Sequence, residues 1–355
     1  PTIVDGTAHF QTTLYTGNGT TQSIDQTGNS TFQPDMVWIK PRSAAYSHFL
    51  TDIVRGVGQR LVPDSTAAED DRDTEFSSFD SDGFSVGMGG GQTNTDTHTI
   101  VAWQWLADNT AGETLTTGTI DSVVAANQTA GFSIFKTTLG ASSSTLYTAA
   151  HGLSSAPEFW IAKEITNASG PFNVYHTGLL SPQEDRNIKL NVDLVEEENT
   201  LIWGSAAPTS SVISFNTGSW GTSKGLIVWC WHSVSGFSDF GNYKGNGNAD
   251  GPFVHCGFRP AFVMVKKTTT AGNNWAIYDT ARDPSNVLNP AYLRADITNA
   301  EGRESDSSQD FDILSNGFKV RNANAMSNTD NVVYIYMAWA EHPFGGSGAS
   351  PVTAR

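Results

Sequence analysis

The pattern of apolar and polar positions along the chain repeats three times. Residues 34–40, 157–163 and 260–266 each begin at a proline, continue as an apolar run and end at a lysine. A short apolar run that starts directly after a turn residue is typical of a buried β-strand. The pattern therefore predicts three equivalent buried strands.

A second apolar block follows each of these runs. Residues 100–105, 227–231 and 334–339 carry large side chains at alternate positions. Successive side chains of a strand point to opposite faces, so such a strand can pack one face on a core while the other face meets a second layer. We therefore expect these blocks to be buried strands as well.

Turn signals complete the pattern in the first and third copies. Asp82-Gly83 and Asn316-Gly317 each lie between apolar segments, and such pairs indicate a β-hairpin because both turn positions favour positive φ. The middle copy lacks this turn but keeps an apolar strand over residues 212–215. Helical periodicity is scarce, so we predict an all-β chain of sandwich units.

The repeats place three units at residues 1–113, 114–234 and 235–345, followed by a Gly/Ser-rich C-terminal tail at 346–355. Units of this size are long enough to hold separate cores. We therefore expect three tandem β-sandwich domains and not a solenoid.

The charge balance of the chain argues against two classes of binding partner. The chain of 355 residues has 36 acidic and 20 basic side chains, a net charge of −16. This balance argues against nucleic acid and against anionic membrane surfaces. The sequence has no apolar run of membrane length and no signal-peptide pattern, so we expect no membrane insertion and synthesis in a cytoplasm.

Candidate metal ligands are concentrated in one acidic segment, Glu69, Asp70, Asp71 and Asp73. Closely spaced carboxylates are either solvated or bridged by a cation, and the candidate cations for this segment are calcium and magnesium. The two cysteines, Cys230 and Cys256, do not form a disulfide framework. Their pairing stays open, with buried free thiols expected.

No catalytic constellation is evident. Residues 191–196 resemble the strand that carries the paired carboxylates of β-glucan-cleaving jelly rolls, but Asn191 occupies the first carboxylate position. A glycosidase of this kind needs both carboxylates. We therefore predict no catalytic residues and no enzymatic activity.

Two acid–base pairs recur at equal spacing, Asp52 with Arg55 and Asp279 with Arg282. Arginine binds a carboxylate through two parallel hydrogen bonds, which suits a loop tied across the end of a sheet. We interpret both pairs as structural.

Sugar binding by a β-protein needs exposed aromatic rings beside polar groups. Most tryptophans lie in strands that we expect to be buried. Trp203, Trp220 and Trp275 lie near loops and are the candidate ligand-binding residues, with core packing as the favoured alternative for each.

Several motifs resemble a known family. They lie at residues 15–19, 151–157, 236–243, 251–260, 314–319 and 340–344. Together they are similar to repeat-containing virion proteins of marine and cyanobacterial tailed bacteriophages, usually labelled tail fibre or hypothetical tail proteins. The resemblance covers nearly the whole chain. It implies jelly-roll or concanavalin-like units of the lectin type and a homo-oligomer, with a trimer favoured.

The resemblance implies a virion structural protein, made in the host cytoplasm and placed on the tail or capsid surface. We expect a tail fibre or receptor-binding tail component that recognises a host surface glycan or protein through multivalent loop contacts. The alternative is a capsid or tail decoration or connector whose partners are other virion proteins. A polysaccharide depolymerase is the third class. No tail-docking segment or trimeric shaft is evident, so a fibre tip and a cap also stay open.

Overall fold

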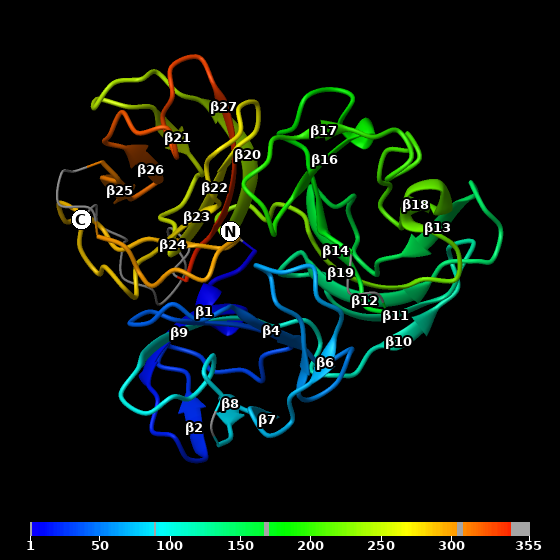
Figure 1. Ribbon diagram of the computed structural model, residues 1–355, viewed down its shortest axis with the longest axis horizontal. Coiled ribbons are helices and arrows are strands. Elements are labelled where there is room, and N and C mark those ends of the chain that lie inside the picture. Colours follow the sequence, from blue (N-terminus) through cyan, green and yellow to red (C-terminus); the bar gives the residue numbers. More distant parts are fainter. Residues whose placement is uncertain (1, 89, 167–169, 304–307, 342–355) are drawn as a thin grey trace.

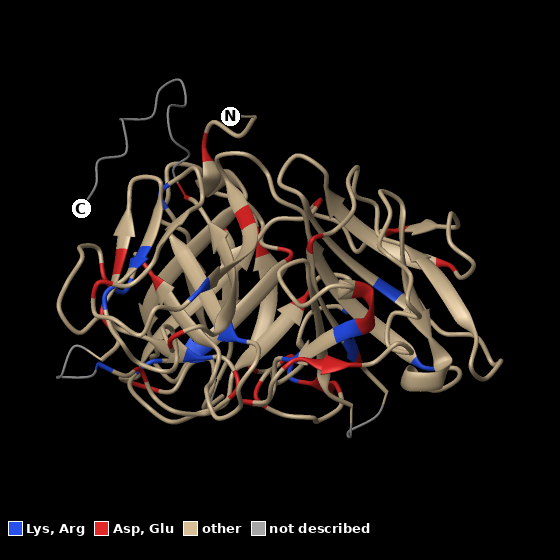
Figure 2. Cartoon of the chain, turned by 90° about the horizontal axis from the view of Figure 1, so that it is seen from above, with Lys and Arg blue, Asp and Glu red and all other residues tan. Residues whose placement is uncertain are grey.

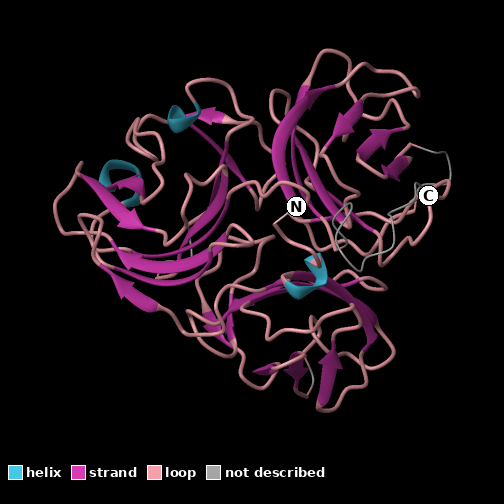
Figure 3. Cartoon of the chain, turned by 180° about the vertical axis from the view of Figure 1, so that it is seen from behind, coloured by secondary structure: helices cyan, strands magenta, loops and turns pink. Residues whose placement is uncertain are grey.

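The computed structural model describes residues 2–88, 90–166, 170–303 and 308–341. Strands dominate (Figure 3), and the helices of the described residues are the short η1 (Gly6–Ala8), η2 (Gln183–Asp185) and α1 (Thr217–Trp220). The prediction of an all-β fold is confirmed. None of these helices has the length and apolar character needed to cross a membrane. The predicted tail, 346–355, lies outside the described residues.

Figure 1 shows three lobes around a common centre. The strands of the first lobe are β1 (Phe10–Thr16), β2 (Gln22–Asp25), β3 (Met36–Pro41), β4 (Phe49–Asp52), β5 (Gln59–Arg60), β6 (Asp70–Asp71), β7 (Phe76–Asp80), β8 (Gly83–Val86) and β9 (Thr99–Trp105). The larger sheet has the order β1-β9-β3-β4 and the smaller sheet has the order β2-β8-β7, while β5 pairs with β6.

The second lobe has the widest sheet. Its strands are β10 (Glu113–Leu115), β11 (Ser122–Asn127), β12 (Phe132–Thr138), β13 (Leu146–Ala150), β14 (Phe159–Glu164), β15 (Phe172–His176), β16 (Arg186–Lys189), β17 (Glu197–Glu198), β18 (Val212–Asn216) and β19 (Gly225–Trp231). The larger sheet has the order β10-β11-β12-β19-β14-β15-β16-β17, and β13 pairs with β18 in the smaller one.

The third lobe again has two sheets. Its strands are β20 (Ser238–Lys244), β21 (Phe253–His255), β22 (Phe262–Lys267), β23 (Ala276–Asp279), β24 (Leu293–Arg294), β25 (Phe311–Leu314), β26 (Gly317–Val320) and β27 (Val333–Trp339). The larger sheet has the order β20-β27-β22-β23-β24 and the smaller sheet has the order β21-β26-β25.

The three larger sheets share a central arrangement. β9 lies between β1 and β3, β19 lies between β12 and β14, and β27 lies between β20 and β22. Trp105, Trp231 and Trp339 occupy the same register position, opposite the first residue of β3, β14 and β22. The unit boundaries predicted from the sequence stay predictions, and β10 spans the first of them.

Each central strand is buried on both faces because it lies between two cores. In β9, Val101, Trp103 and Trp105 point to the molecular centre, whereas Ile100 and Ala102 belong to the core of the first lobe. The apolar side chains of β19 and β27 divide between two cores in the same way. Burial on both faces explains why these blocks have no polar side.

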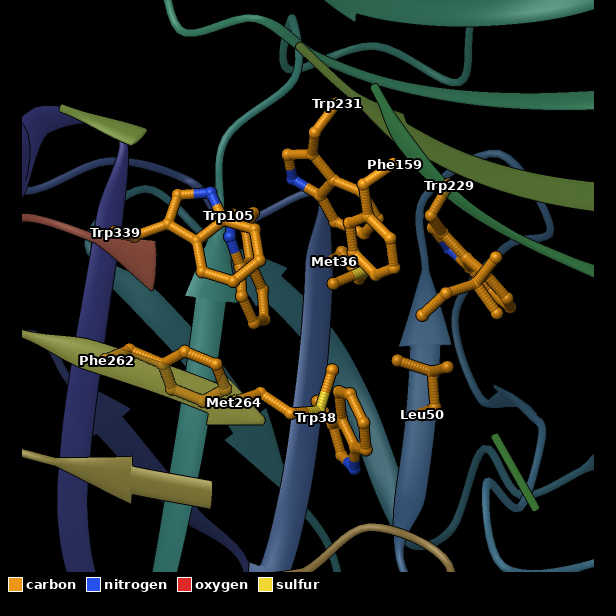
Figure 4. Close-up of a pocket in the computed structure, with 11 residues that line it drawn as sticks. Met36, Trp38, Leu50, Trp105, Phe159, Trp229, Trp231, Phe262, Met264 and Trp339 are labelled. Carbon is orange, nitrogen blue, oxygen red and sulfur yellow. The ribbon is translucent and has the colours of Figure 1, made fainter. Parts of the chain in front are cut away.

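The core at the centre is shared by all three lobes. Trp105, Trp231 and Trp339 form a triangle there, with ring centroids 6.2, 5.5 and 5.7 Å apart and the rings edge to face (Figure 4). The cavity left in this core measures only about 10 Å³. The expectation of three separate cores is therefore corrected to three lobe cores and one shared core, which makes the lobes one packed body.

The predicted hairpins are present, and their glycines have the expected positive φ, 155° at Gly83 and 157° at Gly317, whereas Asp82 and Asn316 do not. β7 ends at Asp80 and β8 begins at Gly83, and the same turn joins β25 to Gly317 of β26. A Cβ atom on Gly83 would lie 2.0 Å from the Ile24 carbonyl oxygen of β2, and one on Gly317 would lie 1.9 Å from the Val254 oxygen of β21. The close approach of the neighbouring strand requires glycine.

The two recurring Asp–Arg pairs hold the lobes together. Asp52 binds Arg55 at 2.6 Å and also accepts the indole N–H of Trp229, from the second lobe, at 3.1 Å. Asp279 binds Arg282 at 2.6 Å and accepts the indole N–H of Trp103, from the first lobe, at 3.1 Å. Each guanidinium also lies within cation–π distance of the same indole ring, at 5.5 and 5.9 Å.

The third contact between lobes uses different residues. Met337 lies at the register position of Trp103 and Trp229 and has no indole N–H to donate. His176 of the second lobe correspondingly replaces the aspartate, and its Nε2 lies 3.0 Å from the Tyr336 carbonyl oxygen of the third lobe. Leu179 stands where the arginine would be. The loss of the tryptophan donor is thus accompanied by the loss of both charges.

Three buried histidines, His48, His151 and His176, are held in the neutral form. In each, Nδ1 accepts an N–H donor and Nε2 lies 2.9–3.1 Å from a backbone carbonyl oxygen. A proton on Nδ1 would face another donor. Burial, the main cause, lowers the pKa of all three to about 4 from the usual 6.5.

We expect acid to destabilise the protein through these histidines. The unfolded chain binds more protons than the folded chain between pH 6.5 and pH 4, so the free energy of unfolding falls as the pH falls through that window. Asp35 opposes this trend, because burial raises its pKa to about 6. The difference between the wild type and His176→Gln isolates the histidine. The variant should lose less stability than the wild type between pH 7 and pH 4.5 in urea unfolding, and equal losses would contradict the interpretation.

Candidate ligand-binding groove

The acidic segment expected as a metal site is paired with arginines. Asp70 contacts Arg60 at 2.6 Å and Arg72 at 2.8 Å, and Glu69 contacts Arg55 at 3.2 Å. Burial alone would raise the pKa of Asp70, but the two guanidinium groups lower it below its usual value. Figure 2 shows charged residues gathered on the side of the molecule away from the N-terminus.

The other two members of the segment are Asp71 and Asp73. The Asp73 backbone N–H donates to the Asp71 side chain at 3.1 Å. Within the described ranges, no cluster of three or more His, Cys, Asp or Glu side chains could hold a metal ion. The calcium role stays a prediction. Cys230 and Cys256 are both buried and free, and burial raises the pKa of each thiol.

The three tryptophans that are candidate ligand-binding residues are buried, in agreement with the alternative of core packing. The exposed fractions are 1% for Trp203, 7% for Trp220 and 0% for Trp275. Each indole N–H donates to a backbone carbonyl, at 2.9–3.1 Å. The Trp275 bond reaches Lys189 of the second lobe, a contact between lobes that sequence proximity does not reveal. Of the three, Trp220 lines a groove of the second lobe.

This groove lies in the second lobe, between the end of the larger sheet and α1, and has a volume of about 350 Å³. A volume of this size suits a small ligand. The residues that dominate its chemistry are Glu164 of β14, Asn173 of β15, Lys189 of β16, Glu197 of β17, Trp220 of α1 and Lys224 before β19. We refer to it as the second-lobe groove.

The groove is found in the lobe whose smaller sheet has one strand fewer among the described residues. The smaller sheets of the first and third lobes each have a third strand, β7 or β25, whereas β13 and β18 of the second lobe have no third strand in the described ranges, and Ile120 makes an isolated bridge to Ala149 of β13. In the first lobe, β7 covers the larger sheet by stacking Phe76 on Phe49 at 6.2 Å. In the third lobe, Phe311 of β25 stacks on Tyr278 at 4.3 Å.

Asn173 marks the consequence of this loss. It pairs with the fourth residue of β14, as Phe49 pairs with the fourth residue of β3. An apolar side chain covered by a neighbouring strand in the first lobe is thus replaced by an amide that lines the groove in the second lobe. Asn173 is 4% exposed, and its Oδ1 accepts a hydrogen bond from Asn187 at 3.1 Å.

Two ion pairs cross the groove. Lys224 Nζ lies 2.8 Å from Glu164 Oε1, and Lys189 Nζ lies 2.9 Å from Glu197 Oε1. Glu164 is nearly buried, with 8% of its side chain exposed, while the other three side chains are between 26% and 43% exposed. Charges held this way are positioned by the protein before a ligand arrives, which lowers the conformational entropy that is lost on binding.

Trp220 forms one wall of the groove and is firmly positioned. Its indole N–H donates to Ile202 at 2.9 Å, and its ring packs on Trp203 and Phe215 at 5.9 and 5.8 Å. The short helix that carries it begins after Asn216, whose side chain accepts the Gly218 N–H. A rigid aromatic wall costs little conformational entropy when a ligand binds.

Trp220 was predicted from the sequence as a candidate ligand-binding residue, but the polar residues of the groove were not. The available signal was the missing hairpin turn of the middle copy. Aligning the first two copies at β3 and β14 without a gap would have placed Phe172 at the position of Phe49, because the connection to Asn173 is one residue longer in the second copy. The missing turn does not show that the position is open to a ligand, because that depends on which strand covers it in space.

Comparison with known proteins gives a family but no function. Residues 5–343 match DUF7483, which is described as a domain of unknown function. The chain belongs to the DUF7483 family. The match runs through all three lobes as one family domain. No curated protein matches the sequence.

Proposed function

We propose that this DUF7483 chain is a non-catalytic virion protein of a tailed bacteriophage that binds the host surface through the second-lobe groove. The observation that carries the proposal is the groove itself, a polar floor beside a fixed tryptophan, at a position where the first lobe has Phe49 covered by β7. The sequence resemblance to tail proteins supplies the virion setting. The homotrimer, by contrast, has no support beyond the resemblance, and light scattering of the purified chain tests it.

The location in the particle is the first test. Cryo-electron microscopy of the intact virion, with this chain assigned to density, should place it at the tail in a few to a few dozen copies. Density over the capsid lattice in hundreds of copies would reject the adsorption role.

A decoration or connector role is the second candidate. Leu288 is 77% exposed and its neighbour Val287 is 37% exposed, in a loop of the third lobe. Exposed apolar side chains of this kind favour contact with another protein. In that case these residues would be buried against a virion neighbour in the particle.

Filling the groove should abolish binding without unfolding the protein. We expect Asn173→Phe to weaken binding of the fluorescently labelled chain to host cells by roughly 10-fold or more, because the ring would occupy the space that the ligand needs. The phenylalanine at the equivalent position of the first lobe, Phe49, shows that this site of the sheet accepts the side chain. Flow cytometry gives the affinity.

Asn173→Ala is the matched control, because it removes the amide but leaves the groove open. It should weaken binding less than Asn173→Phe does. Unchanged cell binding by the phenylalanine variant would exclude the groove as the recognition site.

A further inference from the structure

The charges of the second-lobe groove are already balanced. Two lysines face two glutamates at 2.8 and 2.9 Å. An anionic ligand would have to displace a carboxylate from its lysine, and it would approach a chain of net charge −16. A cationic ligand would have to displace a lysine. A neutral ligand can bind while both ion pairs stay intact.

The ion pairs leave spare hydrogen-bonding capacity on both sides. Oε2 of Glu164 and Oε2 of Glu197 accept no hydrogen bond from the described residues, and each ammonium group has further hydrogens to donate. A hydroxyl group can donate to a carboxylate oxygen and accept from an ammonium group at the same time. Two adjacent hydroxyl groups on one ring of a ligand could therefore form hydrogen bonds with the lysine and the glutamate of one pair.

Asn173 adds a donor at the floor of the groove. Its Oδ1 is occupied by Asn187, while its Nδ2 donates to no partner among the described residues. Asn173 and Glu164 are 4% and 6% exposed as residues, but Nδ2 of Asn173 and Oε2 of Glu164 are not among the fully buried atoms that lack a partner. Both atoms can therefore meet solvent, and a hydroxyl group of a ligand could take the place of that water.

The apolar part of the groove completes the match. Trp220, Pro171 and Ile202 lie beside the polar groups. A sugar ring presents C–H groups on one face and hydroxyl groups around its edge, so it packs on an aromatic or apolar wall while its hydroxyl groups bind polar side chains. The volume of about 350 Å³ accommodates one or two such rings.

From this combination we infer that the second-lobe groove binds a neutral saccharide of one or two rings through adjacent hydroxyl groups, with the Lys224–Glu164 and Lys189–Glu197 pairs intact. The inference rests on the proposed function, because it names the ligand class of the same groove.

The test is isothermal titration calorimetry of the full chain with glucose, galactose, mannose, their neutral disaccharides and glucuronate. At least one neutral sugar should bind, with an affinity that changes less than about 2-fold when the salt concentration is raised, since no net charge is neutralised. Tighter binding of glucuronate that weakens in salt would overturn the inference, and so would the absence of binding by every neutral sugar.

Matched lysine variants assign the binding to this groove. Lys224→Met removes an ammonium group that is 29% exposed and lies 2.8 Å from Glu164, and it should weaken sugar binding about 10- to 100-fold. Lys319→Met removes one that is 23% exposed and lies 2.8 Å from Asp250 in the third lobe, and it should leave sugar binding unchanged. Equal affinities of the two variants would place the sugar elsewhere.

Cell binding and particle location separate this inference from the proposed function. If the chain binds host cells through the groove but no neutral sugar, the recognition role stands and the ligand class is wrong. If it binds a neutral sugar but lies on the capsid lattice, the ligand class stands and the adsorption role is wrong.

Discussion

Replacing Asp279 with asparagine is expected to lower the free energy of unfolding by roughly 3–5 kcal/mol, the usual result of removing one partner of a buried ion pair. The side chains of Asp279 and Arg282 are both 0% exposed, and Oδ2 lies 2.6 Å from the guanidinium Nε. The same oxygen accepts the Trp103 indole hydrogen from the first lobe. Neutralising it leaves the buried arginine with Glu301 at 3.5 Å as the remaining carboxylate partner among the described residues.

Guanidinium chloride unfolding followed by tryptophan fluorescence measures this loss. Asp250→Asn is the control, because Asp250 lies 2.8 Å from Lys319 but its side chain is 80% exposed. Exposed pairs contribute at most about 1 kcal/mol. Similar losses for the two variants would mean that the contact between Asp279, Arg282 and Trp103 contributes no more than a surface pair does.

Replacing Trp105 with alanine is expected to cost roughly 3–5 kcal/mol and to loosen all three lobes together. Trp105 is 3% exposed, and its ring contacts Trp231 and Trp339 in the shared core. A cavity at this position removes packing from the second and third lobes as well as from the first. Because the core is shared, we expect wild type and variant to unfold in one cooperative step, with a lower midpoint in the variant.

Calorimetry and denaturant unfolding together test this prediction. Trp105→Phe keeps an aromatic ring, and the indole nitrogen of Trp105 has no hydrogen-bond partner in the described part of the chain. The phenylalanine variant should therefore cost about 1–2 kcal/mol, less than the alanine variant. Two or three separate transitions in the wild type would show that the lobes unfold independently and that the shared core does not couple them.

The strands were predictable because their signals are local. The apolar runs at 34–40, 157–163 and 260–266 became β3, β14 and β22, and the later blocks became the central strands of the three larger sheets. The hairpin turns before Gly83 and Gly317 also lie where the sequence places them. Such features depend on side chains within a few residues of each other.

The burial of the lysines that end the three apolar runs could not be predicted from local sequence signals. A lysine at a strand end is usually exposed, but Lys40 and Lys163 are 0% exposed and Lys266 is 1% exposed. Lys40 Nζ donates to the Thr298 carbonyl, from the third lobe, at 3.1 Å. Burial lowers the pKa of each of these lysines to about 8.

The candidate site was less predictable than the fold. Trp220 was chosen for its position near a loop, and it does line the groove, although it is only 7% exposed. Trp203 and Trp275 carried the same signal and are buried. The deciding feature is that the smaller sheet of the second lobe has no third strand among the described residues, and this gains meaning only when the sheets are compared in space.

The sequence by itself determined the strands, the turns between them, the acidic character and the recurrence of Asp–Arg pairs, because these follow from residue type and short spacing. Only the tertiary structure decided which tryptophan of another lobe each Asp–Arg pair contacts. Trp103 and Asp279 are 176 positions apart, and Trp229 and Asp52 are 177 positions apart. It also decided that three tryptophans meet in one core and that one lobe has a groove. Burial and access depend on what packs against a side chain, and here the packing partners lie in other lobes or, for the groove, in a third strand that the described residues of the second lobe do not form.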